Sequence, residues 1–137
     1  MPLNLIKLCV GCDTVDELLT WRGEIARPGD PWILRTRQTP KRAAELLDGG
    51  SLYRVYRGTI LSRQRILAVD TVGEGPAKRC EMALDHLVVL TLPTPRRAFQ
   101  GWRYLTVDDS PLDLGVAGFD GDVPMELAKQ LREAGVW

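Results

Sequence analysis

The sequence is poor in the residues that most enzymes use for chemistry. Its 137 residues include one histidine, His86, and three cysteines, and aromatic residues make up 7% of the chain. Three cysteines cannot all pair within one chain, which favours a reducing compartment over a disulfide framework. No serine stands in a G-x-S-x-G nucleophile elbow, so the sequence does not indicate hydrolase chemistry around His86. We therefore predict no catalytic residues and no cofactor, and we favour a protein that is not an enzyme.

Long apolar runs and targeting signals are also missing. The most apolar stretch, Leu87 to Leu92, is far shorter than the roughly 20 residues that a membrane-spanning helix needs. Near the N-terminus Lys7 interrupts the apolar residues, and no small-residue cleavage site follows, so a secretory signal peptide is not indicated. We therefore expect a cytoplasmic protein with no membrane partner.

What is present has the composition of an ordinary globular protein. Apolar residues make up 45% of the chain and charged residues 26%, and both shares are typical of soluble domains. A chain of this length buries a sizeable core without disulfides or metals. We predict a single domain over residues 1–137.

Strand-forming residues gather in several stretches separated by glycine and proline. In residues 79–84 apolar and polar side chains alternate, which is typical of an antiparallel strand with one face in solvent. Gly58 predicts a bend or bulge between two strands, and we expect residues 108–122, rich in glycine and aspartate, to be irregular. The predicted strand regions are 3–10, 32–37, 52–71, 79–92 and 99–107.

Helix-capping patterns predict three helices. Thr14-x-x-Glu17 is a capping box, in which the hydroxyl and the carboxylate satisfy free amides of the first turn. Thr39 precedes Pro40, an arrangement typical of an N-cap followed by proline at the first helical position. The first two helices are predicted to end near Gly23 and at Gly49-Gly50, and a third to begin at Asp122 or Val123.

These elements predict an α+β fold. We expect a mainly antiparallel sheet of about five strands, curled towards a barrel, with the helices on its flanks.

Charge is separated along the chain, although the net charge is zero. Residues 33–103 carry 13 basic against 6 acidic side chains, residues 1–32 carry 3 against 5, and residues 104–137 carry 2 against 7. The three segments therefore have net charges of +7, −2 and −5, which sum to zero. A basic middle of this kind favours an anionic partner, such as RNA or DNA.

The basic residues of the middle segment are mostly arginines interleaved with aromatic residues. Arginine suits forked contacts to phosphate and stacking on bases, and aromatic rings add the stacking surface that holds single-stranded nucleic acid. We therefore predict a small RNA-binding module built on a central arginine-rich sheet. The predicted nucleic-acid-binding residues are Arg54, Tyr56, Arg57, Arg63, Arg65, Trp102 and Arg103.

Two other interpretations stay open. Cys9-x-x-Cys12 precedes a helix, as thioredoxin-type redox motifs do. Together with Cys80 and His86, these cysteines are of the residue types that form a Cys3His zinc site. Six residues from Cys80 to His86 is an awkward spacing along a strand, so we assign no metal site. In the second alternative the arginines only keep the sheet soluble or dock an acidic protein partner.

Three stretches together resemble a bacterial family described as a domain of unknown function. They are LNLIKLCVG, PKRAAELLDGGSLYRVYRGTILSRQRIL and PRRAFQGWRYL, and they extend over most of the chain. The resemblance implies no catalytic residues, because that family has no assigned activity. More distantly, LLDGGSLYRVYRG is similar in outline to the helix-to-strand passage of PUA-like folds, including the ASCH and EVE domains. That likeness implies a small barrel that binds RNA or modified bases.

Overall fold

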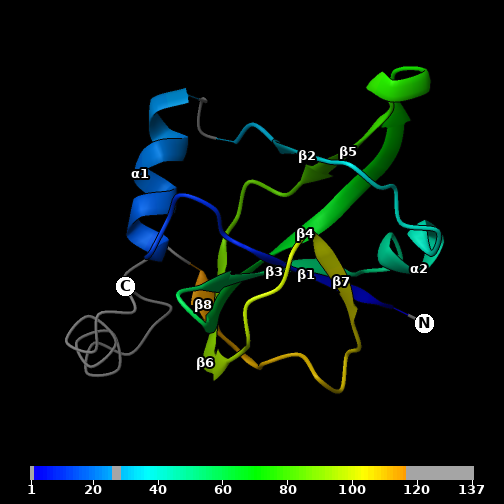
Figure 1. Ribbon diagram of the computed structural model, residues 1–137. Helices are drawn as coiled ribbons and strands as arrows, with labels where there is room; N and C mark the ends of the chain where they lie inside the picture. The colour runs from blue at the N-terminus through cyan, green and yellow to red at the C-terminus, as the bar shows by residue number, and fades with distance from the viewer. Residues whose placement is uncertain (1, 26–28, 117–137) are drawn as a thin grey trace.

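An open mixed sheet of eight strands dominates the computed structural model, which describes residues 2–25 and 29–116 (Figure 1). The predicted C-terminal helix lies outside the described residues. The strands are β1 (Asn4–Leu8), β2 (Trp32–Thr36), β3 (Ser51–Tyr56), β4 (Thr59–Val72), β5 (Arg79–Leu84), β6 (Val89–Pro95), β7 (Trp102–Leu105) and β8 (Asp113–Val116). The helices are α1 (Val15–Ile25) and α2 (Ala43–Leu46), with a 3₁₀ turn at Gly75–Ala77.

The sheet is almost entirely antiparallel, as predicted. Six strands follow one another in the order β2-β5-β4-β3-β1-β7, while β6 pairs with β4 and β8. Only β1 and β3 are parallel among the pairs described, and the long connection between them holds α1, β2 and α2. The prediction of about five strands was too low. The described strands form an open sheet, so the expected curl into a barrel is not shown.

The longest strand, β4, connects the two halves of the sheet. Its first part pairs with β3 on one side and β6 on the other, and its last part, from Ile66 onward, pairs with β5. Residues 85–88 connect β5 to β6, which pair with different parts of β4. In Figure 1 the β3–β4 turn and the 3₁₀ turn lie at opposite ends of β4. Side chains at these two ends are therefore far apart.

The first predicted helix cap is confirmed. The Thr14 hydroxyl accepts a hydrogen bond from the Glu17 amide at 3.1 Å, and the Glu17 carboxylate accepts one from the Asp13 amide at 3.1 Å. This arrangement fixes the start of α1, which extends to Ile25 rather than ending near Gly23.

The second helix is shorter than predicted, and its cap is different. Arg42 occupies the N-cap position of α2, and Thr39 does not cap it. Instead the Thr39 hydroxyl lies 2.8 Å from the hydroxyl of Thr71 at the end of β4. Gly49 follows the helix with a φ of +93°, so the predicted left-handed residue is confirmed there.

Strand β8 corrects a second expectation. It lies within residues 108–122, which we expected to be irregular, and pairs with β6 from Val89 to Thr91. Asp113 and Gly115 have low strand propensity, so this short strand depends on its pairing with β6.

The hydrophobic core is divided between the two faces of the sheet. One cluster includes Leu52 and Tyr56 of β3, together with residues of α1, α2 and β5. The other includes Tyr53 and Val55 of the same strand with Ile60. Because side chains alternate along a strand, β3 is buried on both faces. No helix in the part of the chain that the structure describes is long and apolar enough to cross a membrane.

Candidate nucleic-acid interface

The predicted nucleic-acid-binding residues divide between the two faces of the sheet. Arg54 and Tyr56 alternate with Tyr53 and Val55 along β3, so they share a face, as predicted. Trp102 packs against the cluster on that face. The remaining four predicted residues lie on the opposite face or at the β3–β4 turn; they are Arg57, Arg63, Arg65 and Arg103.

The two aromatic members are engaged within the protein. Tyr56 is 1% exposed, and its hydroxyl lies 2.7 Å from the Ser62 hydroxyl. Burial raises the pKa of Tyr56 well above its usual value. Trp102 donates its indole N–H to the Gln38 carbonyl at 3.1 Å and packs edge-on against Tyr104, with 5.1 Å between the ring centroids. Tyr56 therefore has no surface on which a base could stack.

Arg63 is neutralised by an acidic residue from β8. Its Nε and Nη2 donate to the two carboxylate oxygens of Asp113 at 2.7 and 2.6 Å, and its Nη1 donates to the Ser51 hydroxyl at 3.0 Å. Hydrogen bonding to Asp113 raises the pKa of Arg63. This forked pair leaves Arg63 with little capacity to bind an external phosphate.

A group of exposed arginines gathers where the β3–β4 turn meets the segment that follows β6. The Arg96 amide donates to the Gly58 carbonyl at 2.8 Å, which joins the two segments. Phe99 is half-buried, with the Arg96 and Arg103 guanidinium carbons 6.0 and 5.5 Å from its ring centroid. We name this group the arginine cluster: Arg57, Arg96, Arg97 and Arg103, of which Arg96 and Arg103 contact Phe99.

The positive charge of the arginine cluster is not balanced locally. Residues 49–69 and 86–107, which supply all of its members, contain no aspartate or glutamate. Within the described chain none of the four arginines forms an ion pair. Arg65 is also exposed and forms no ion pair within the described residues, but it lies further along β4, opposite Ser51. The cluster is thus an accessible cationic surface with an aromatic centre.

Arg57 and Arg103 were among the predicted binding residues, whereas Arg96, Arg97 and Phe99 were not. Arg96, Arg97 and Phe99 follow the prolines that end β6, a position expected to be a loop. The signal was present as the acid-free run PRRAFQGWR. What the sequence could not reveal is that this run lies beside the β3–β4 turn, because that contact joins residues about 40 positions apart.

The four residues of the thiol and zinc alternative do not form one site. Cys80 is fully buried in β5, and the half-exposed His86 has its Nδ1 3.1 Å from Asp85. Over residues 2–25 and 29–116, no three histidine, cysteine or acidic side chains are placed to share a metal ion. Cys9 and Cys12 do lie together, but burial raises the pKa of the Cys9 thiol to about 12. A thiol that stays protonated at neutral pH is a poor nucleophile.

Comparison with known proteins identifies the family. A family model described as "Protein of unknown function (DUF1489)" matches residues 5–137, so the chain belongs to this family. No curated protein and no solved structure matches the chain.

Proposed function

We propose that this DUF1489 family member is a nucleic-acid-binding module of the bacterial cytoplasm that holds single-stranded RNA on the arginine cluster. The observation that supports this most directly is that Arg96 and Arg103 both contact the Phe99 ring, with Arg57 on the adjoining turn. Guanidinium groups around an aromatic ring combine phosphate contacts with stacking surface.

The backbone holds the cluster in place. Arg57 and Gly58 form a two-residue hairpin turn in which both have positive φ, +48° and +82°. Arg103 donates its Nη1 to the carbonyls of Gln100 and Trp102 at 3.0 and 3.2 Å, which holds its guanidinium over the loop. Pre-positioned side chains lose less conformational entropy on binding than free ones.

The likeness to PUA-like RNA-binding folds is part of this proposal. It rests on the sequence LLDGGSLYRVYRG, which in this chain forms the end of α2, the Gly49-Gly50 turn and β3. Likeness of fold does not by itself assign a function, so the arginine cluster carries the argument.

Salt-dependent binding of a labelled oligouridine tests the proposal. For four phosphate contacts on a single strand, the logarithm of the binding constant should fall with the logarithm of salt concentration with a slope of about −3. The double variant Arg96→Gln/Arg103→Gln should lower the affinity at low salt and reduce the slope by about 1.4. Fluorescence anisotropy over a salt series measures both quantities.

A matched control removes the same charge elsewhere. Arg37 and Arg79 lie near the far end of β4, since Arg79 pairs with Val72 and Arg37 follows the last residue of β2. Arg79 also donates its Nη1 to two backbone carbonyls, as Arg103 does. Arg37→Gln/Arg79→Gln should therefore leave most of the affinity intact. Equal losses of oligouridine affinity in both double variants would show that binding depends only on the net charge of the protein. Absence of oligouridine binding at low salt would refute the proposal.

A further inference from the structure

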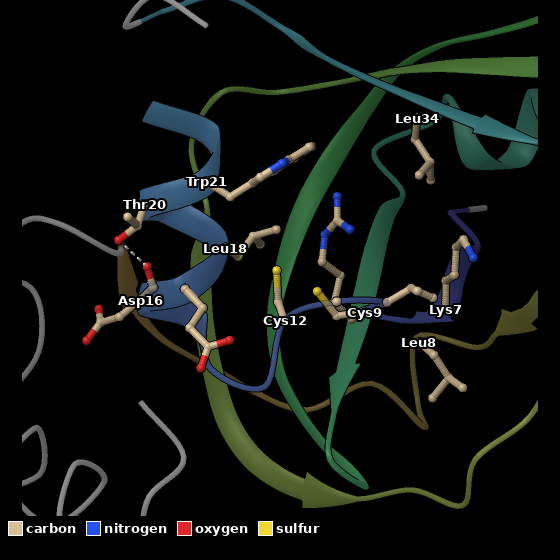
Figure 2. Close-up of a pocket in the computed structure, with 13 residues that line it drawn as sticks. Lys7, Leu8, Cys9, Cys12, Asp16, Leu18, Thr20, Trp21 and Leu34 are labelled. Atoms are coloured by element: carbon tan, nitrogen blue, oxygen red, sulfur yellow. Dashed lines mark hydrogen bonds between the residues drawn. The ribbon is translucent and has the colours of Figure 1, made fainter. Parts of the chain in front are cut away.

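A pocket separate from the arginine cluster opens between α1 and the sheet (Figure 2). Its volume is about 700 Å³, within the range of small-molecule sites. Figure 2 shows Leu18 and Trp21 of α1 facing the space above the thiols of Cys9 and Cys12, with Leu34 of β2 on the far side. The walls are mainly apolar, and Arg54 of β3 also lines the pocket.

Arg54 is an unusual residue for such a place, because it is only 8% exposed. Its Nε and Nη2 both donate to the Oε1 of Gln64, at 3.3 and 3.2 Å, and its guanidinium carbon lies 5.6 Å from the centroid of the Trp32 ring. Gln64 is fixed in turn, since its Nε2 donates to the Asp85 carbonyl at 2.9 Å. The guanidinium is therefore held in one orientation.

The charge of Arg54 is not neutralised inside the protein. The guanidinium contacts the neutral Gln64 amide, the Trp32 ring and the neighbouring Cys9 thiol, and no carboxylate in the described residues forms an ion pair with it. Of the acidic residues lining the pocket, Glu17 uses its carboxylate to cap α1, and Asp16 is exposed. A buried cation without a counter-charge is costly, and a bound anion would remove that cost.

We propose that this pocket binds an amphipathic monocarboxylate, with the carboxylate on Arg54 and the apolar part against Leu18, Trp21 and Leu34. A guanidinium fork matches the planar carboxylate group and binds it through two parallel hydrogen bonds. The pocket lining holds two basic residues, Lys7 and Arg54, and two acidic residues, Asp16 and Glu17, so it has no excess positive charge to favour multiply charged anions such as nucleotides. The apolar walls select a ligand with a hydrocarbon or aromatic body.

The test compares octanoate with 1-octanol by isothermal titration calorimetry on the full chain. The two probes share their hydrocarbon chain and differ in the carboxylate, so octanoate should bind at least about tenfold more tightly. Acetate, which has the carboxylate without the chain, should bind more weakly than octanoate. Equal binding of octanoate and octanol, or no octanoate binding at millimolar concentration, would overturn the proposal.

Variants assign the binding to the pocket. Arg54→Gln should reduce octanoate affinity at least about tenfold, and Arg54→Lys should retain part of it, because lysine keeps the charge but loses the fork. Trp21 is half-exposed, so Trp21→Ala keeps the core intact and should weaken octanoate binding without changing the response to acetate. If Arg54→Gln fails to fold, Trp21→Ala still decides the outcome: unchanged octanoate affinity in that variant would overturn the proposal.

The pocket and the arginine cluster can be tested independently. The variant Arg96→Gln/Arg103→Gln should bind octanoate with wild-type affinity, and Trp21→Ala should bind oligouridine as the wild type does. Loss of octanoate binding on changing the cluster would contradict a separate site in the pocket.

Discussion

Cys9 and Tyr56 are titratable groups that the fold keeps in their neutral forms. Burial raises the pKa of the Cys9 thiol from 9.0 to about 12 and that of the Tyr56 hydroxyl beyond its usual range. Burial also raises the pKa of Tyr53. The neighbouring Arg54 lowers the Cys9 pKa, but by less than burial raises it. The neutral thiol places no negative charge beside Arg54, so it does not compete with the anion that we propose binds there.

These shifts predict sensitivity to base. For a group whose pKa is higher in the folded than in the unfolded state, its contribution to stability is complete below the unfolded value and is lost as pH rises. For Cys9 the loss should extend from about pH 9 to about pH 12. Urea unfolding at pH 7, 9, 10 and 11 should show a falling free energy of unfolding, with Cys9→Ala reducing the slope by up to about 1.4 kcal/mol per pH unit.

Val10→Ala provides a control, because Val10 is highly exposed, lies beside Cys9 and does not titrate. It should keep the wild-type dependence on pH. An identical slope in Cys9→Ala and the wild type would show that the thiol ionises equally in the folded and unfolded chains.

The turn from α2 into β3 depends on two adjacent glycines with different constraints. A Cβ at Gly50 would lie 2.1 Å from the Leu3 carbonyl oxygen and 2.6 Å from the Leu46 carbonyl oxygen. A Cβ at Gly49 would meet nothing within 4 Å, although its φ of +93° disfavours other residues. Gly50 is thus required by close backbone approach, and Gly49 by backbone conformation.

This difference predicts unequal costs of substitution. Gly50→Ala should destabilise the protein by about 3 kcal/mol or more, because backbone atoms of two elements must move apart. Gly49→Ala should cost about 1 kcal/mol, the usual penalty for a left-handed residue other than glycine. Thermal or urea unfolding of the two variants measures the difference. Similar losses of stability in both variants would show that the backbone of Leu3 and Leu46 can move away from residue 50 at little cost in free energy.

The elements that the sequence predicts well are those defined by local contacts. The capping box at Thr14 and Glu17 lies within four residues, and it appears in the structure. Thr39 has an equally good local pattern, but its hydroxyl lies beside Thr71, 32 positions away, and α2 begins later. β8 was missed for a similar reason, because only its pairing with β6 makes a strand of a sequence with low strand propensity.

At the level of the whole molecule, some arginines of the basic middle segment form ion pairs with acidic residues, and others do not. Arg63 from the basic middle is matched by Asp113 from the acidic last third, whereas the arginine cluster is unmatched within the described residues. All four members of the arginine cluster lie within the basic middle segment, residues 33–103. The charge pattern did not show which arginines are internal, because β3 is buried on both faces and Arg54 takes a core position.

The Arg63–Asp113 pair should contribute measurably to stability. Arg63 is 25% exposed in this pair, whereas Arg35 in the pair with Glu81 is 67% exposed. Asp113→Asn should therefore lower the free energy of unfolding by about 1 kcal/mol, and Glu81→Gln by a smaller amount, because exposed pairs are screened by solvent. Urea unfolding at low salt measures both variants. Equal losses would mean that partial burial adds nothing to the Arg63 pair.

The position of β2 at one end of the strand order has a consequence for solubility in concentrated solution. A terminal strand exposes hydrogen-bonding groups that can recruit strands from other molecules into fibrils. Here Pro31 precedes the strand, the exposed Arg35 lies within it and Arg37 follows it. Proline and charge at such a border oppose growth of intermolecular sheets. Arg35 and Arg37, which contribute to the basic middle of the chain, therefore also disfavour strand addition at this edge of the described sheet.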